Sequence, residues 1–454
     1  MAEGVNTKAA DASRLRRPVV HLILLLALAV LFGGGGVRYG LANLVVQLAA
    51  LAVLGANRAA AMQFLAAGPR WLIVLLACSV LLPLFQLVPL SPRIWTALPG
   101  RTPVIESLTL IGSGSDGWRA LTLDSGRTLV AFCGTLVSAT MIIIGSTLDA
   151  RDKRLLGAAL GASGGIAVLA GAIQLGSGNT VLMAQDFDHN RRVLYAGFAN
   201  RNSTGLFFVI AMLAWTGCWR AGGKVPAWLA VMLCSLLALA TVLTQSRSAI
   251  ALLIPCAIFV GFRFFRAGAD LHGRSARGQG MGLALALAAV GAVASAMLFS
   301  ATQNGRVAQS LARFSDTDTD RPQMWEDAAY AAGVYWPAGS GMGTFDEVFQ
   351  LSESLEYVSP RRAGRAHNDW IELAIEAGPY GLALAIGWLV WITVAAWRSF
   401  GTGQGWQASA AAIGASCIAA QSLLDYPLRN QTMLCVAGLL IVMLVPTRTQ
   451  GGGR

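Results

Sequence analysis

Long apolar stretches recur along the whole chain and alternate with shorter polar segments. A helix that crosses the hydrocarbon core of a bilayer needs about 20 mainly apolar residues, and roughly twelve stretches come close to that length. The pattern therefore predicts an all-α polytopic membrane protein with about 12 transmembrane helices. The expected spans are 18–36, 41–56, 71–90, 127–148, 155–176, 203–219, 227–244, 248–262, 281–300, 379–397, 407–424 and 431–446.

The polar segments set the remaining organisation. Residues 1–17 are polar and basic, and no clear cleavage site follows them, so we expect a cytoplasmic N-terminal tail and an uncleaved first span. Transmembrane helices 1–9 are expected within 18–300 and helices 10–12 within 379–446, followed by a cytoplasmic tail at 447–454. Residues 301–378 are too long for a connector. They predict a small periplasmic helical domain between the ninth and tenth spans.

Composition and charge agree with this topology. The chain is 55% hydrophobic and 13% charged, which leaves too little polar surface for a globular protein in water. All three lysines (Lys8, Lys153 and Lys224) fall on the inner side when the N-terminus is inside, as the positive-inside rule requires. The seven cysteines lie singly in or beside apolar stretches, so we expect neither a disulfide framework nor a zinc site.

His367 is the first candidate for chemistry. It precedes a short amphipathic pattern that leads into the tenth span, with Asp369, Glu372 and Glu376 on the face opposite the apolar residues. The partial positive charge of a helix N-terminus favours a neutral, proton-accepting ring. We interpret His367 as a general base at the membrane interface, its ring oriented by Glu372 or Asp369; the alternative is a histidine that only caps the helix.

Arginines without lysines form the second candidate group on the outer side. A guanidinium binds phosphate oxygens through a planar fork of donors and keeps its charge. Arg247 stands out because Leu243–Ala249 joins two spans with almost no loop, and a charge at such depth is costly unless it has a function. The alternative is an arginine that extends toward lipid headgroups. The further substrate-binding candidates are Arg191, Arg192, Arg201, Arg321, Trp325 and Arg365.

Three other motifs give weaker signals. Trp325 could stack on sugar or lipid, or simply pack in a core. The segment Asp316–Asp320 looks like a calcium loop, but Arg321 and Asp327 stand where an EF-hand needs Gly and Glu, so we expect a solvated loop without metal. The glycine-rich segment Gly339–Phe345 is on the outer side, where free nucleotide is scarce, and predicts a tight turn.

Taken together, several short segments resemble the O-antigen ligase and polymerase superfamily. The resemblance is carried by His367-Asn368-x9-Gly378-x-x-Gly381, Gly339-x-Gly341-x-Gly343-Thr-Phe345, Arg321 with Trp325, Thr244-Gln-Ser-Arg247, Gly197-Phe-Ala-Asn-Arg-Asn202 and Leu424-Asp-Tyr-Pro427. One departure is Ala251, where ligases often have Leu four residues after the junction arginine.

The resemblance implies a multi-pass protein of the bacterial inner membrane with its active site facing the periplasm. Such ligases transfer O-antigen polysaccharide from undecaprenyl diphosphate to lipid A-core without ATP, metal or other cofactor. By matching position, His367, Arg247, Arg191 and Arg192 would be functional. The implied partners are undecaprenyl-diphosphate-linked O-antigen, lipid A-core and membrane lipid, with no nucleic acid.

Other functions remain open from the sequence. An O-antigen polymerase or a protein O-oligosaccharyltransferase of the same superfamily would use the same donor. A transporter of lipid-linked glycan would place charged or broken helices near the bilayer midplane. Here the ionisable residues gather at the outer ends of the predicted spans, which argues against a transporter. The sequence therefore favours an inverting glycosyltransferase in which His367 is the base and arginines bind the diphosphate.

Overall fold

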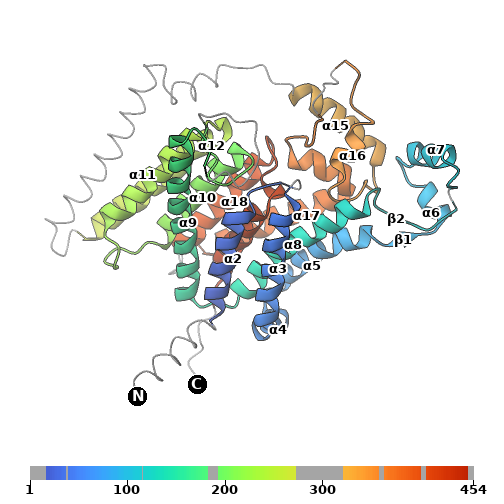
Figure 1. Ribbon diagram of the computed structural model, residues 1–454. Helices are drawn as coiled ribbons and strands as arrows, with labels where there is room; N and C mark the ends of the chain where they lie inside the picture. Colours follow the sequence, from blue (N-terminus) through green and yellow to red (C-terminus); the bar gives the residue numbers. More distant parts are fainter. Residues whose placement is uncertain are drawn as a thin grey trace, which may run out of the picture.

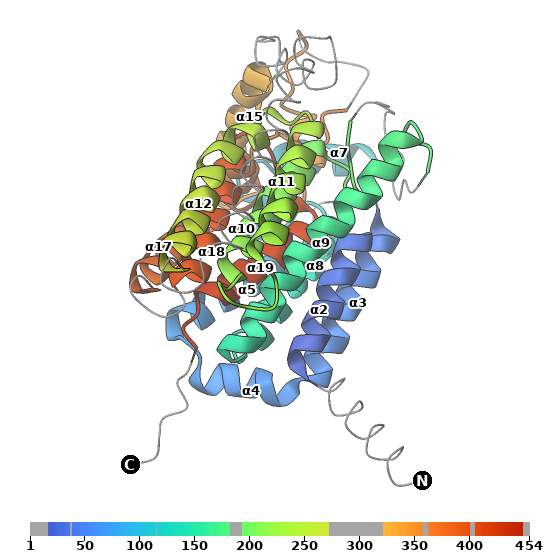
Figure 2. The ribbon, with the colours of Figure 1, turned by 90° about the vertical axis from the view of Figure 1, so that its left-hand side faces the viewer.

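The computed structural model of the chain describes residues 17–36, 39–114, 116–181, 193–271, 321–356, 362–399 and 405–447. These residues are mostly helical and include one two-stranded antiparallel ribbon (Figure 1). The main helices pack side by side as a bundle, seen from its side in Figure 2. They are α2 (Pro18–Phe32), α3 (Gly40–Ala56), α5 (Arg70–Gln86), α8 (Ser125–Gly145), α9 (Ala150–Gly176), α10 (Arg201–Cys218), α11 (Ala227–Leu243), α12 (Arg247–Leu271), α17 (Asp369–Ser399), α18 (Gly405–Gln421) and α19 (Gln431–Leu444). Helix α4 (Arg58–Ala67) lies across one end of the bundle (Figure 2).

Helix α10 lies at the centre of the bundle, where it packs against α9, α11, α12 and α18. Its residues from Ser203 to Cys218 are buried except Trp215, which is half-buried. A helix that is apolar on all sides belongs in the interior, because no face of it gains from contact with water. Peripheral helices instead present large apolar side chains outward, such as Ile166 on α9 and Ile258 on α12, as expected for contact with lipid.

The expected helical membrane architecture is confirmed, whereas the number of spans is not. Eleven of the predicted spans overlap helices of the bundle, and the predicted span 281–300 lies outside the described residues. Within the described part, four helices are long and apolar enough to cross a membrane: α8, α9, α12 and α17. A fifth span would arise if α3 and α4, which meet at 77°, count as one. The total of twelve remains a prediction.

A small helical cap lies over the end of the bundle opposite α4, within the range predicted as a separate domain (Figure 2). It contains α15 (Arg321–Tyr335), α16 (Phe345–Phe349) and the first turns of α17. Tyr335, Phe345, Phe349 and Ile375 are buried together there, and the rings of Phe345 and Phe349 stack at 5.0 Å. The cap thus has a hydrophobic core of its own, although the limits of the domain at 301 and 378 stay a prediction.

The glycine-rich segment joins the cap to the bundle through a turn that only glycines allow. Gly339, Gly341 and Gly343 all have positive φ angles, of 78°, 114° and 86°. A Cβ on Gly339 would lie 2.5 Å from the carbonyl oxygen of Glu376, and one on Gly341 would collide with the side chain of Thr122. The expected tight turn is therefore present, and close contact with α17 and the start of α8 explains its glycines.

A second break divides α17. Gly378 has φ 56° and ψ −144°, which are not helical values, and Pro379 follows it. The first half of α17 therefore belongs to the cap, and the second half runs down the bundle against α5 and α18. The sequence placed the end of the amphipathic pattern and the start of the tenth span at this same point.

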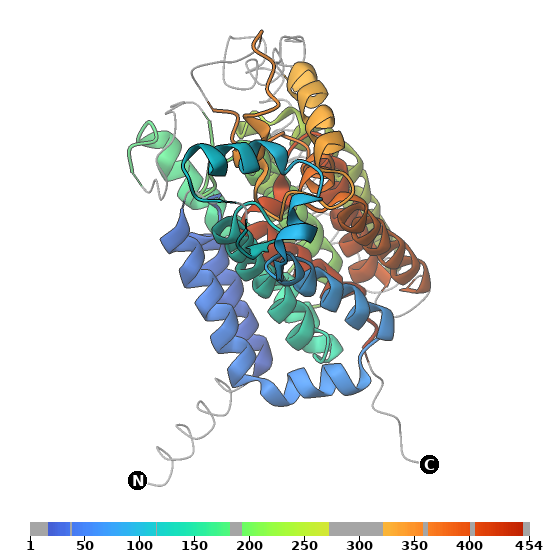
Figure 3. The same cartoon turned by 90° about the vertical axis from the view of Figure 1, so that its right-hand side faces the viewer.

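A hairpin segment projects sideways from the bundle near the cap (Figure 1). It consists of β1 (Pro89–Leu90), α6 (Pro92–Thr96), α7 (Thr102–Leu110) and β2 (Arg119–Ala120), with β1 antiparallel to β2. Figure 3 looks onto this segment, which lies below α15 and above α5. The segment lies mainly between the predicted spans 71–90 and 127–148, where the sequence predicted no membrane helix.

We expect Gly341→Ala to lower the free energy of unfolding by at least about 2 kcal/mol, because the new methyl group adds a clash to an unfavourable φ. Denaturant titration of the purified protein in mixed micelles would measure the change. Gly333→Ala on α15 is the matched control: a Cβ there meets no atom within 4 Å. It should raise stability by roughly 0.5–1 kcal/mol. Equal effects of the two substitutions would contradict this account.

Candidate functional site

His367 lies at the junction of the cap and the bundle, two residues before α17 begins. Its backbone has φ 52°, and its side chain is 32% exposed. The Nδ1 atom is 3.1 Å from Oδ1 of Asp425, and the ring lies 5.0 Å from that of Tyr426. The residue that caps the helix is Asn368, whose Oδ1 accepts hydrogen bonds from the amides of Trp370 and Ile371. His367 is therefore held by a carboxylate and is not used as the cap.

Asp425 is the residue that orients the histidine ring. It follows α18, is fully buried, and also accepts a hydrogen bond of 2.9 Å from Nδ2 of Asn200. Burial raises the pKa of the Asp425 carboxyl, but the hydrogen bond and attraction from His367 outweigh it, so the pKa lies below its ordinary value. Asp425 is thus an anion at neutral pH. The expectation that Glu372 or Asp369 orients His367 is wrong.

Those carboxylates bind arginines instead. Arg429, in the 3-10 turn η1 (Pro427–Arg429), contacts Asp369 at 3.2 Å, Glu372 at 3.2 Å and Glu376 at 2.8 Å. Arg365 adds a second contact to Glu372 at 3.1 Å. Glu372 and Glu376 have no exposed surface. Burial acts to lower the pKa of Arg429, but attraction from the three carboxylates outweighs it and raises that pKa above its ordinary value. Because the three acids are three and four residues apart, they lie on one face of the helix, and one arginine can contact all of them.

Arg247 occupies the first position of α12 and is half-buried. The turn before it contains Gln245 with φ 54°, and Ser246 donates a hydrogen bond of 2.8 Å to Oδ1 of Asn202. The amide of Asn202 in turn donates to Oδ1 of Asn200, the residue that binds Asp425. A continuous polar path therefore leads from the turn of Arg247 to the partner of His367.

The remaining predicted site residues divide into three groups. Arg201 is half-buried at the first position of α10, next to Asn200 and Asn202. Arg321 and Trp325 hold the backbone of the site: Nη1 of Arg321 donates to the carbonyl of Leu424 and Nε1 of Trp325 to that of Ala366, both at 2.8 Å. Arg191 and Arg192 lie outside the described residues, as does the loop Asp316–Asp320.

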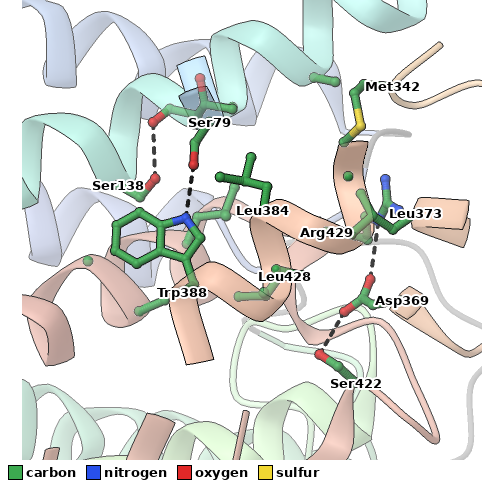
Figure 4. Close-up of a pocket in the computed structure, with 18 of the residues that line it drawn as sticks. Ser79, Ser138, Met342, Asp369, Leu373, Leu384, Trp388, Ser422, Leu428 and Arg429 are labelled. Carbon is green, nitrogen blue, oxygen red and sulfur yellow. Dashed lines mark hydrogen bonds and ion pairs between the residues drawn. The ribbon is translucent and has the colours of Figure 1, made fainter. Parts of the chain in front are cut away.

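An apolar cavity of about 410 Å³ lies beside this junction. Its walls come from α5, α8, α17, α18 and α19, while Arg365, Asp369 and Arg429 line its charged end. Figure 4 shows Asp369, Arg429 and Ser422 at that end. At the other end, Nε1 of Trp388 donates a hydrogen bond to Oγ of Ser79. His367 and Arg247 are not among the lining residues. The cavity is shaped for a hydrocarbon group that approaches the junction from within the bundle.

Residues 232–386 match the family model described as O-antigen ligase. This segment carries an O-antigen ligase domain. The match confirms the resemblance noted in the sequence, and it includes Arg247, the cap and His367. No curated protein matches the chain. The ligase domain implies activity of the O-antigen ligase or polymerase type on lipid-linked glycans.

Two residues of the candidate site come from outside the matched segment. Asp425, in the α18–η1 connection, contacts His367, and Asn200, at the start of α10, contacts Asp425. The sequence did contain a signal for Asp425, because Leu424-Asp-Tyr-Pro427 was part of the resemblance. Its contact with His367, 58 residues away, needed the fold.

The lowered pKa of Asp425 predicts a pH-dependent contribution to stability. A depressed carboxyl pKa stabilises the folded state above the ordinary value of about 3.9, and this stabilisation disappears as pH falls through the folded value. We expect wild type to be more stable than Asp425→Asn at pH 7, with the difference shrinking below about pH 4. Thermal unfolding in nanodiscs across this pH range would measure it. A difference that does not change with pH would contradict the assignment of Asp425 as a buried anion.

Proposed function

We propose that the chain transfers an O-antigen glycan from undecaprenyl diphosphate to lipid A-core at the periplasmic face of the bacterial inner membrane. The observation that carries the proposal is the contact between His367 and buried Asp425, within and beside an O-antigen ligase domain. A histidine whose Nδ1 is bonded to a carboxylate presents Nε2 as the proton acceptor. This arrangement suits the activation of a hydroxyl group.

The reaction would be a single displacement. The oxygen of the acceptor hydroxyl forms a bond to the anomeric carbon of the donor sugar while its proton moves to Nε2 of His367. The bond from that carbon to the diphosphate oxygen breaks, and undecaprenyl diphosphate leaves with the electron pair. Attack from the opposite side inverts the anomeric configuration. Asp425 stabilises the positive charge that develops on the ring.

Arg247 and Arg201 would hold the departing diphosphate, together with Arg191 and Arg192. Arg247 and Arg201 stand at the N-terminal ends of α12 and α10, which pack against each other. Helix N-termini add partial positive charge to that of the guanidinium groups, and preorganised donors of this kind stabilise a leaving anion. The arrangement supports a reaction that proceeds without metal. Arg321, Trp325 and Arg365 are proposed to border the sugar.

The apolar cavity would receive the hydrocarbon chain of a lipid-linked substrate. The three arginines that line it are already paired: Arg429 contacts three carboxylates, Arg365 contacts Glu372, and Arg127 contacts Glu347. A diphosphate in the cavity would compete with the buried carboxylates for these arginines. A hydrocarbon chain, in contrast, matches the apolar walls. We therefore assign the diphosphate to the side of Arg247 and the chain to the cavity.

In an assay with undecaprenyl-diphosphate glycan and lipid A-core, in the presence of chelator, His367→Asn and Arg247→Ala should each lower kcat/KM by about 10²-fold to 10⁴-fold. Asparagine is chosen because it tolerates the positive φ of His367 better than alanine. Product would be followed by gel mobility of the ligated lipid.

Arg220→Ala is the matched control for charge removal, since Arg220 is exposed and lies at the opposite end of α10. It should keep wild-type activity. Full activity in His367→Asn would reject the general-base role. Growth of the donor glycan without product on lipid A-core would identify a polymerase instead.

The cavity assignment leads to a separate expectation. Ala385→Trp should raise KM about tenfold or more for a donor with a long polyprenyl chain, because the indole would fill space that the chain needs. A water-soluble donor with a short chain should be affected much less. Ala383→Trp on the same helix is the control, because Ala383 is exposed and does not line the cavity. The assignment would be rejected if Ala385→Trp changed KM equally for both donors.

A further inference from the structure

The hairpin segment carries an unusual concentration of exposed apolar side chains. Leu110 is 87% exposed, Ile111 75% and Trp118 70%, and Val88 and Ile94 are also exposed. Helix α7 has no buried residue at all. Water-facing surfaces of soluble proteins rarely gather large apolar groups this densely, so such a patch indicates a surface that is covered in use.

The position of the segment indicates what covers it. The chain enters it directly from α5, whose Leu81 and Phe85 are 57% and 63% exposed on the outside of the bundle. In Figure 3, the segment lies above α5 and below α15 of the cap, beside the upper part of the bundle. The exposed apolar surface of α5 therefore continues into that of the hairpin near the end of the bundle, where we expect hydrocarbon to give way to headgroups.

The residue types of the segment match that boundary. Tryptophan is enriched at membrane interfaces because its ring is apolar and its N–H is polar. Arg93 is exposed, and Arg119 is half-buried beside the ring of Trp95. Arginines at this depth can reach lipid phosphates while their stems stay against apolar groups.

The segment is also tied firmly to the glycine-rich turn. Arg101 is fully buried, and its Nη2 donates hydrogen bonds to the carbonyls of Leu121, at 2.6 Å, and Gly339, at 3.2 Å. The amide of Leu123 donates to the carbonyl of Ser340 at 2.8 Å. A surface that fixes the position of the hairpin therefore also fixes the position of the turn. The turn also donates backbone hydrogen bonds to the carbonyls of Ile375 and Glu376 in the first half of α17.

We propose that residues 88–114 and 116–120 form an interfacial anchor in which Leu110, Ile111 and Trp118 enter the lipid leaflet on the His367 side. Through Arg101, this anchor fixes the height of the glycine-rich turn, and with it the start of α17, above the hydrocarbon. The inference does not depend on the reaction proposed for the site.

The test uses the full chain in phospholipid nanodiscs with a photoreactive benzoylphenylalanine at one position. Irradiation at position 111 or 118 should give lipid adducts, detected by intact mass, in about tenfold excess over position 106, because burial in lipid favours the apolar positions. Glu106 is the control, because it is exposed on α7 and its charge indicates a position that faces water. Position 85 on α5 is the positive control.

Two results would overturn the proposal. One is a lipid adduct at position 85 with none in excess at positions 111 and 118, which would place the hairpin in water. The other is cross-linking of positions 111 and 118 to a second copy of the chain, which would make the patch an oligomer contact. Position 110 provides a further variant if either substitution prevents folding.

Discussion

The pairing of buried charges is the constraint on which the site depends. Arg429 contacts three carboxylates of α17, and two of them, Glu372 and Glu376, are fully buried. Each of these charges would be strongly destabilising alone, so the first half of α17 has to lie over η1 in one position. That position brings His367, just before the helix, to Asp425, just before η1. The catalytic geometry that we propose thus follows from an ionic cluster that does not touch the histidine.

Glycines provide the second requirement, close approach of backbones. Gly339 and Gly341 let the turn pass against α17 and Thr122, and Gly378 lets α17 change direction before it enters the bundle. Side chains at these points would push the cap away from the bundle by the width of a methyl group or more. Charge pairing selects the arrangement of the cap, and the glycines make that arrangement sterically possible.

The fold and the site were predictable to different degrees. Apolar length located the helices of the bundle because burial in lipid depends on local composition. Helical periodicity also placed His367 before an amphipathic turn. The partners Asp425 and Arg429 could not be assigned, since their contacts to His367 and to the acids of α17 depend on how distant segments pack. The same limitation explains the error over Glu372: periodicity identifies a polar face without showing which charge will lie opposite.

The connection that carries Asp425 has a consequence for the biosynthesis of the protein. Asp425 and Arg429 stand between the last two helices, while His367 and the acids that they bind are made earlier. During translation, Glu372 can already pair with Arg365, whereas Glu376 leaves the ribosome before Arg429 exists and lacks that partner until α18 has been inserted. A nascent chain halted before Asp425 would contain the whole ligase domain without its assembled site. Completion of the C-terminal helices would then be the step that assembles the candidate site.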